Sequence, residues 1–399
     1  MTAPIDSLAK VCGDVRAAGP EDGVLGAVPR LVAAPATVAE AAEVMRAAAE
    51  LGLAVVPRGM ETRLDWGLPP ERCDLLVDTA RLDRIVEHEA GDLVVKAEAG
   101  VRLGDLAAAL AEHGQRLALD SPLPGATVGG TVATGSAGPL RLLYGSPRDL
   151  VIGLTIVRAD GRIARSGGKV VKNVAGYDLG RLFAGSWGTL GLIVEATFRL
   201  HPMPAAAAYV STVVPDPAAA HEAVQSVLHS PVAPSAVECA ATPDGIAVGA
   251  LLEGVPDGVT ARSGQVNDLF GGGARVEQEP PAWWGGYPDG TTLIEITAPP
   301  TALAHADWLT GSATWSAAGR GLLGLPGDLT PERAAETLEG LRAALAPHKG
   351  GAVVRYAPEP VRDALDVWGP VPALSLMRRV KDQFDPERRL SPGRFVGGI

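Results

Sequence analysis

Residues 122–138 read PLPGATVGGTVATGSAG, a stretch rich in glycine and small residues that contains no charged side chain. The uncharged run around it, residues 121–140, has the length of a membrane-spanning helix. Its prolines and glycines would interrupt such a helix repeatedly. Glycine also lets backbone N–H groups turn toward an anion and lets a phosphate approach the chain closely. We therefore interpret this run as a loop with a binding function rather than as a membrane span.

Two further glycine-rich segments occur on either side of this stretch, PRGMET at residues 57–62 and GSWGTLG at residues 185–191. Taken one at a time, each of them could be an ordinary turn. Segment 185–191 has G-x-x-G-x-x-G spacing, but we expect it to follow a helix and precede a strand, the reverse of a Rossmann pyrophosphate turn. The pair Gly168-Lys169 is followed by Val170, which does not fit a nucleotide-hydrolase phosphate loop. Both of these nucleotide-binding classes are therefore disfavoured.

The composition is that of a packed globular protein. The 399 residues include 49 glycines and 33 prolines, and 47% of the chain is hydrophobic against 20% charged, which excludes a disordered chain. A net charge of −11 repels phosphate backbones, so we expect no nucleic-acid partner. Three widely spaced cysteines and the lack of a recognisable secretory signal favour a cytoplasmic location.

The first half of the chain has the periodicity of a mixed α+β domain. Residues 37–52 open with Thr37 and Glu40 at capping-box spacing and continue with apolar residues at helical intervals. The tetrapeptide HPMP at residues 201–204 is interpreted as a domain boundary. We further expect helices over residues 103–113 and 177–184, and strands over residues 53–56, 84–88, 93–98, 150–158, 162–165 and 193–200.

Beyond this boundary the predicted elements follow the order strand, helix, strand, strand, helix, which resembles half of a ferredoxin-like sandwich. A second round runs from residue 291 to residue 356, so two such halves would form one domain. A helix over residues 374–384 is expected to begin a structured tail. The first round is expected at residues 209–214, 218–229, 236–240, 246–253 and 260–269, and the helices of the second round near residues 302–309 and 331–346.

Four motifs in a fixed order carry a family resemblance. They are PRGMET at 57–62, the glycine-rich stretch at 122–138 followed by YGSPRDLVIGLTIVRADGRI at 144–163, GYDLGRLFAGSWGTLGLIVEATFRLHPMP at 176–204, and FDPERRLSPGR at 384–394. Together they resemble the flavoproteins that have an FAD-binding domain of the p-cresol methylhydroxylase type. Within that family the chain is most similar to the FAD-binding subunit of bacterial glycolate oxidase. The resemblance is strongest over residues 28–204.

This resemblance implies an α+β fold, with a two-subdomain FAD-binding domain of the p-cresol methylhydroxylase type and a ferredoxin-like α+β second domain. The expected boundaries are residues 28–204 for the FAD-binding domain, 205–372 for the second, substrate-side domain, and 373–399 for a tail that returns to the first. We expect Gly129 to need the left-handed backbone angles that glycine allows. The cofactor-binding residues implied by the resemblance are Pro57, Arg58, Gly59, Met60, Glu61, Thr62, Thr127, Val128, Gly129, Gly130, Thr134, Gly135, Ser136, Gly188 and Ile193.

The resemblance also implies a function. It indicates an FAD-dependent oxidoreductase acting on CH–OH groups, as the FAD-binding subunit of a glycolate or other 2-hydroxy-acid oxidase or dehydrogenase complex. The implied partners are a catalytic flavoprotein subunit, an iron–sulfur subunit and a small 2-hydroxy acid, and such subunits could hold the protein at the inner membrane. Two alternatives stay open: a self-sufficient FAD oxidoreductase of the same fold with another substrate, and a non-catalytic structural subunit.

FAD is expected to be bound non-covalently. Relatives with a histidyl–flavin bond carry a histidine in the segment that corresponds to PRGMET, whereas residues 58–63 read RGMETR here. The sequence does not identify the catalytic residues. Arg320, Arg355 and Tyr356 are weak candidates for contact with a substrate carboxylate, since guanidinium groups bind carboxylates bidentately. Ion pairing within the protein is the more common role of such arginines.

Two remaining groups of residues bear on the substrate side. The aromatic residues Trp283, Trp284 and Tyr287 could cover a flavin or a substrate, although a packed loop is the more common explanation. Related flavoproteins that oxidise 2-hydroxy acids alone carry closely spaced histidines that bind a divalent metal. No such spacing occurs here, so we expect no metal site and a partner subunit that holds the substrate chemistry. The histidines of the expected second domain are His221, His229, His305 and His348.

Overall fold

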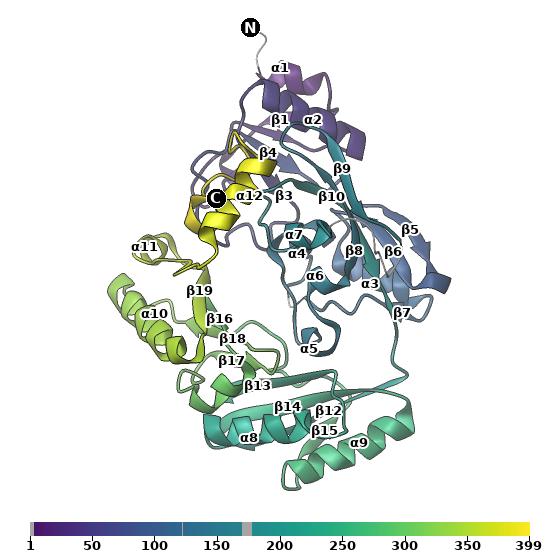
Figure 1. The fold of residues 1–399 in the computed structure, drawn as a ribbon, viewed down its shortest axis with the longest axis vertical. Coiled ribbons are helices and arrows are strands. Elements are labelled where there is room, and N and C mark those ends of the chain that lie inside the picture. The colour runs from purple at the N-terminus through teal and green to yellow at the C-terminus, as the bar shows by residue number, and fades with distance from the viewer. Residues whose placement is uncertain (1–3, 122, 170–177) are drawn as a thin grey trace. The chain divides into compact units, whose positions relative to one another are not determined.

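The computed structural model describes residues 4–121, 123–169 and 178–399, and the chain divides into two compact units (Figure 1). The first unit comprises Met1–Ala137, Ser146–Met203 and Pro370–Ile399, and the second comprises Gly138–Gly145 and Pro204–Gly369. The first unit thus includes both ends of the chain. Among the described residues, no helix is both long and apolar enough to cross a membrane.

The first unit opens with a four-stranded sheet in the order β1-β2-β4-β3. Strands β2, β4 and β3 are parallel, and β1 is antiparallel to β2. The buried face of α2 packs on this sheet in one apolar core. The elements are α1 (Pro4–Ala9), β1 (Val15–Ala17), a 3₁₀ helix (Pro20–Asp22), β2 (Leu31–Ala33), α2 (Val38–Glu50), β3 (Val55–Arg58) and β4 (Leu75–Asp78).

The start of α2 follows the prediction with one difference. The Thr37 hydroxyl accepts a hydrogen bond from the Glu40 backbone N–H at 3.1 Å, as an N-cap residue should. The Glu40 carboxylate accepts from the Ala36 backbone N–H at 2.8 Å rather than from Thr37. The expected capping box is therefore only half formed, because the glutamate reaches one residue further back.

A second sheet in the same unit has five antiparallel strands in the order β5-β6-β10-β8-β9. Of the helix expected over residues 177–184, the structure describes α7, and residue 177 lies outside the described residues. The elements are β5 (Ile85–Glu89), a 3₁₀ helix (Ala90–Asp92), β6 (Val94–Glu98), α3 (Leu103–Ala111), β7 (Gln115–Arg116), α6 (Pro147–Leu150), β8 (Val151–Val157), β9 (Ile163–Gly167), α7 (Gly180–Phe183), β10 (Leu192–Arg199) and β11 (His201–Pro202).

The glycine-rich run at residues 121–140 is not a continuous loop, which corrects that expectation. It contains a short helix, α4 (Val128–Thr134). Thr127 caps its N-terminus, and Gly135 ends it in the left-handed conformation with φ 65°. The prolines lie outside the helix, so they do not interfere with its hydrogen bonds.

The second unit is built on one antiparallel sheet of eight strands in the order β15-β12-β14-β13-β17-β18-β16-β19. Each half has the ferredoxin-like order of strands, and the halves join where β13 pairs with β17. The predicted doubling is therefore confirmed. The elements are α5 (Arg141–Tyr144), β12 (Ala206–Val214), α8 (Pro217–Leu228), β13 (Ala236–Thr242), β14 (Gly245–Gly254), α9 (Pro256–Leu269), β15 (Arg275–Glu277), β16 (Thr292–Thr297), β17 (Ala313–Ser316), β18 (Arg320–Leu325), α10 (Pro331–Leu345), β19 (Gly351–Tyr356) and α11 (Glu359–Asp363).

The helix expected near residues 302–309 is a shorter 3₁₀ helix, Pro300–His305. Pro299 and Pro300 occupy its start, where proline is tolerated because the first backbone N–H groups of a helix have no partner within it. A second 3₁₀ helix, Ala346–His348, follows α10.

The C-terminal segment, yellow in Figure 1, belongs to the first unit. It consists of α12 (Leu374–Phe384) and a tail that ends in a 3₁₀ helix, Val396–Gly398. The tail runs parallel to β3: the Val55 N–H donates to Arg389 O at 2.7 Å, and the Ser391 N–H donates to Val55 O at 2.8 Å. The tail thus lies beside the strand that leads into the PRGMET loop.

Candidate cofactor site

A cavity in the first unit is bounded by the three glycine-rich segments and the C-terminal tail. It encloses about 790 Å³, including space open to solvent at its mouth. The lining residues are Pro57, Arg58, Gly59, Met60, Glu61, Thr62, Arg63, Leu64, Thr79, Ala99, Thr127, Gly129, Gly130, Ala133, Thr134, Trp187, Gly188, Gly191, Leu192, Ile193, Ser391 and Arg394.

The first of the three glycine-rich segments along the chain, PRGMET at residues 57–62, leaves the end of β3. It runs close against the second, the stretch at residues 122–138. A Cβ atom on Gly59 would lie 2.7 Å from Thr127 Oγ1, so only glycine fits there without displacement. Two residues later Glu61 has φ 60°, an uncommon angle for a side-chain-bearing residue. The loop is therefore tightly turned and packs closely against Thr127.

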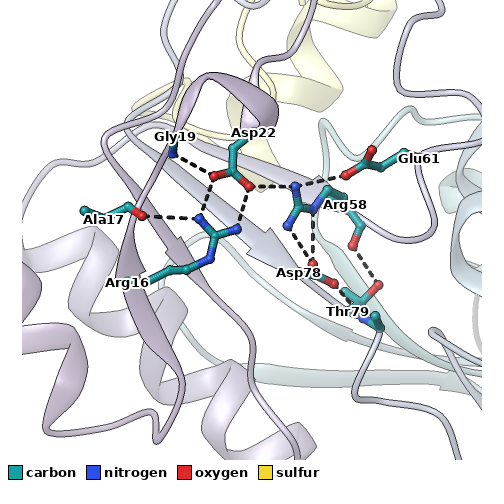
Figure 2. A network of polar contacts seen from close by, with 9 residues as sticks. Arg16, Ala17, Gly19, Asp22, Arg58, Glu61, Asp78 and Thr79 are labelled. Atoms are coloured by element: carbon teal, nitrogen blue, oxygen red, sulfur yellow. Dashed lines mark hydrogen bonds and ion pairs between the residues drawn. The ribbon is translucent and has the colours of Figure 1, made fainter.

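Arg58, expected to bind the cofactor, directs its guanidinium to carboxylates of the protein (Figure 2). Its Nη1 lies 2.9 Å from Asp22 Oδ1 and 2.9 Å from Glu61 Oε1, and its Nη2 lies 2.8 Å from Asp78 Oδ2. Asp22 is also held by Arg16. Hydrogen bonding from Arg16 is the main reason that the pKa of Asp22 is held well below its usual range. The positive charge of Arg58 is thus balanced within the network.

The second glycine-rich segment, residues 122–138, is held in its conformation by hydrogen bonds of its own polar side chains. Thr127 Oγ1 accepts from the Gly130 N–H at 3.3 Å, and the Thr134 hydroxyl donates to Gly130 O at 2.8 Å. A Cβ on Gly129 would lie 2.7 Å from Ala99 Cβ. Gly129 lies inside α4 and does not have a left-handed φ, so that expectation was wrong. Its side-chain position points at a packed neighbour, and this close approach is what requires glycine.

The third segment turns sharply beside the first. Trp187 has φ 58° and Gly188 has φ 71°, and a Cβ on Gly188 would approach Pro57 Cγ to 3.3 Å. The Trp187 ring stacks on Phe395 of the tail with 5.9 Å between ring centroids. The tail therefore packs directly against this wall of the cavity.

A buried lysine ties the tail to the third segment. Lys381 of α12 is 1% exposed. Its Nζ donates to Thr189 O and Leu390 O, both at 2.8 Å, and to Asp385 Oδ2 at 2.7 Å. Leu390 precedes Ser391, which lines the cavity. One ammonium group thus joins a helix, the third segment and the tail.

Most of the cofactor residues implied by the resemblance lie around this one cavity. The exceptions are Val128, which is fully buried, Gly135, which ends α4, and Ser136, which is buried beside it. The tail residues Ser391 and Arg394 were missed, although the motif FDPERRLSPGR that contains them was noticed. Arg63, Ala133, Trp187, Gly191 and Leu192 also lie within the quoted motifs, whereas Leu64, Thr79 and Ala99 line the cavity without a sequence signal.

The weak catalytic candidates Arg320 and Arg355 meet in the second unit around Glu295. Arg320 Nη2 lies 2.6 Å from Glu295 Oε2, and Arg355 Nη2 lies 2.7 Å from Glu295 Oε1. Burial opposes ionisation of Glu295, but the two guanidiniums outweigh it and hold its pKa well below the usual range. The Tyr356 hydroxyl donates to Gly290 O at 3.3 Å. In this structure the arginines therefore bind a carboxylate of the protein itself.

The remaining substrate-side candidates have packing contacts. A Cβ on Gly249 of β14 would lie 2.8 Å from the Trp283 ring and 3.1 Å from the Trp284 ring, so both indoles lie against the sheet, as a packed loop would. His305 and His348 stack with 4.9 Å between ring centroids despite their distance in sequence. Within the described residues, no group of three potential metal-ligating side chains forms around them.

Comparison with known proteins identifies these features. Residues 29–167 match the family described as the FAD binding domain, and residues 368–395 match the C-terminal domain of FAD linked oxidases. An uncharacterized FAD-linked oxidoreductase of Mycobacterium tuberculosis is 30% identical over 92% of this chain and 91% of its own length. Glycolate oxidase subunit GlcE of Escherichia coli is 46% identical, over 31% of this chain and 35% of that subunit.

The fold comparison agrees with the expected architecture. The crystal structure of p-cresol methylhydroxylase with substrate bound has a TM-score of 0.74 at 18% identity, and the alignment covers 98% of this chain and 96% of that one. The cavity also suits FAD on its own geometry. Its lining includes Gly59, Gly129, Gly130, Gly188 and Gly191, and glycine lets a diphosphate approach the backbone closely.

Proposed function

This chain belongs to the FAD-linked oxidoreductases, and we propose that it is the FAD-binding subunit of a complex that oxidises glycolate or a related 2-hydroxy acid. The cavity in the first unit carries the proposal, because three glycine-rich segments and the tail converge on it. The similarity of part of the chain to a glycolate oxidase subunit supports the choice of substrate class. The proposed partners are a catalytic flavoprotein subunit and an iron–sulfur subunit.

The residues of the cavity bind and orient the cofactor. We propose that residues 57–62 and 127–130 surround the diphosphate with backbone, and that Gly188 and Ile193 lie near the adenine. When bound, FAD would supply a redox centre that accepts electrons from the partner subunit and passes them onward. Apolar lining side chains such as Leu64 and Leu192 would limit the access of water to the bound cofactor.

The side-chain contacts of the second unit favour the proposal that a partner subunit carries out the substrate chemistry. Arg320 and Arg355 already share the Glu295 carboxylate. The stacked pair His305 and His348 acquires no third ligating side chain among the described residues. A metal that polarises a substrate hydroxyl ordinarily needs three or more protein ligands. We therefore place the oxidised substrate with a partner subunit and assign this chain to FAD binding and electron transfer.

We expect the FAD to be non-covalent. The first loop, residues 58–63, contains no histidine, cysteine or tyrosine to which a flavin could be attached. Precipitating the purified yellow protein with acid should leave the flavin in the supernatant. Flavin fluorescence that migrates with the polypeptide on a denaturing gel would contradict this expectation, and a colourless protein that binds no added FAD would favour the structural-subunit alternative.

We also expect the isolated chain to oxidise glycolate and D-lactate more slowly than about one turnover per second, which is the low end for ordinary enzymes. Steady-state assays with an artificial electron acceptor, with and without added divalent metal, measure this. Chemical reduction with dithionite is the control that the bound FAD is redox-active. Turnover at several per second or faster would show a self-sufficient enzyme instead.

A further inference from the structure

We propose that Arg394, in the C-terminal tail, is the fixed cation that binds the diphosphate of FAD, and that the Ser391 hydroxyl is a second donor from the same tail. Both residues line the cavity of the first unit. The inference rests on the proposed position of FAD in that cavity. It goes further because it assigns the charge complement of the cofactor to the end of the chain rather than to the PRGMET loop.

Arg394 is a buried cation without a counter-ion in the described part of the chain. Its side chain is 6% exposed. Its Nη2 donates to Leu64 O at 2.7 Å and to Trp66 O at 2.8 Å, two neutral acceptors that fix the guanidinium in place. Its Nε has no hydrogen-bond partner among the described atoms. Asp65 attracts it only over a longer range. Burying an unpaired charge is costly, so an anionic ligand would relieve this arrangement.

The other arginines that line the cavity are engaged differently. Arg58 is surrounded by Asp22, Asp78 and Glu61, so it brings little net positive charge. Arg63 lies over the Trp66 ring, 5.4 Å from its centroid, and donates to Ser121 Oγ. Arg394 differs from Arg58 in that its hydrogen bonds go to two neutral carbonyl oxygens, so no hydrogen-bonded carboxylate balances its charge.

Ser391 provides a second, independent observation. It is 1% exposed, and its Oγ has no hydrogen-bond partner among the described atoms. Its φ of 44° is unusual for a residue with a side chain, and its backbone N–H is held by Val55 O. A buried hydroxyl in a strained conformation and a buried cation thus stand three residues apart on one cavity wall.

The diphosphate is the part of FAD that matches these groups. It carries negative charge in every redox state of the cofactor, whereas the flavin ring becomes anionic only on reduction. A guanidinium binds phosphate oxygens bidentately. A permanently charged arginine in a fixed position therefore fits the permanent anion of the ligand.

The test uses the full-length protein stripped of flavin, with FAD, ADP and adenosine as probes. ADP carries the diphosphate and adenosine does not. R394Q keeps an amide that can donate to Leu64 O but loses the charge, and R394K keeps a charge but loses the planar group. R379Q, at an exposed position of α12, is the matched control for loss of one positive charge. Calorimetry or flavin fluorescence gives each dissociation constant, and circular dichroism confirms folding.

We expect R394Q to bind FAD and ADP about 10- to 100-fold more weakly than wild type, the range for loss of a charge-assisted hydrogen bond. Its affinity for adenosine should be unchanged. R394K should fall between R394Q and wild type, and R379Q should match wild type. An R394Q protein that binds ADP within twofold of wild type overturns the inference, as does equal weakening of ADP and adenosine. If wild type binds neither FAD nor ADP, the proposed cofactor site itself fails.

If R394Q does not fold, nucleotide binding by the wild-type protein still tests the inference. Under the proposal ADP binds at least tenfold more tightly than adenosine, and the difference shrinks as salt screens the charges. Equal affinity for ADP and adenosine, or a difference insensitive to salt, would overturn the inference.

Discussion

Replacing Lys381 with methionine is expected to lower the free energy of unfolding of the first unit by about 3–5 kcal/mol, the range seen when one partner of a buried ion pair is removed. The variant keeps an unbranched side chain, one atom shorter, but leaves the Asp385 carboxylate buried without its cation. Asp385 is 0% exposed. The carbonyls of Thr189 and Leu390 also lose their donor, and each buried unsatisfied acceptor adds to the cost.

The same substitution should loosen the tail beside the cavity. Lys381 connects α12 to the third glycine-rich segment through Thr189 and to the strand-like tail through Leu390. Without it, the residues that follow Leu390, including Ser391 and Arg394, lose a fixed anchor. We therefore expect hydrogen exchange to become faster at the Ser391 N–H, which is bonded to Val55 O in the wild type.

Urea unfolding and native-state hydrogen exchange measure these effects. R379M is the matched control, because Arg379 is exposed on the same helix and its loss should change stability by less than about 0.5 kcal/mol. The double variant K381M/D385N removes the stranded charge and should recover part of the loss. A K381M protein as stable as R379M would show that the buried ammonium contributes nothing.

Replacing Glu295 with glutamine is expected to lower the free energy of unfolding of the second unit by about 3–5 kcal/mol. The variant preserves the shape of the side chain but removes the charge that Arg320 and Arg355 share. Arg320 and Glu295 are 9% exposed each, so water compensates little. Two like charges then remain together without the carboxylate that holds them.

The effect should depend on pH in a defined direction. The pKa of Glu295 is lowered in the folded protein, so its ion pairs stabilise the fold fully above the pKa of the unfolded chain. That contribution is lost as the pH falls from about 5 toward the folded-state pKa. The difference in stability between wild type and E295Q should therefore be largest at neutral pH and shrink under acid conditions.

Chemical unfolding at a series of pH values checks this prediction. E336Q is the control: Glu336 pairs with Arg333 at 3.9 Å with both side chains 72% exposed, and exposed pairs contribute less than about 1 kcal/mol. A difference between wild type and E295Q that stays constant from pH 7 to pH 3 would refute the assignment of the lowered pKa to the two arginines.

Local features of the sequence carried much of the fold. The resemblance carried by four motifs in order implied an FAD-binding domain, and the alternation of helix and strand predicted two ferredoxin-like halves. The prediction from alternation held because helix capping, strand periodicity and turn residues act over a few positions. Where they failed, as at Gly129, the reason was a contact with a distant residue, Ala99.

Only the tertiary structure determines which charged side chains are neutralised within the protein and which could bind a ligand. Arg58 stands in the motif that suggests cofactor binding, yet Asp22, 36 residues earlier, neutralises it. Arg320 and Arg355 resemble substrate-binding arginines, but the fold brings both to Glu295. Lys381 meets Thr189 across 192 positions of sequence. The energy of a buried charge depends on every neighbour within a few ångströms, and chain folding, rather than spacing along the sequence, determines those neighbours.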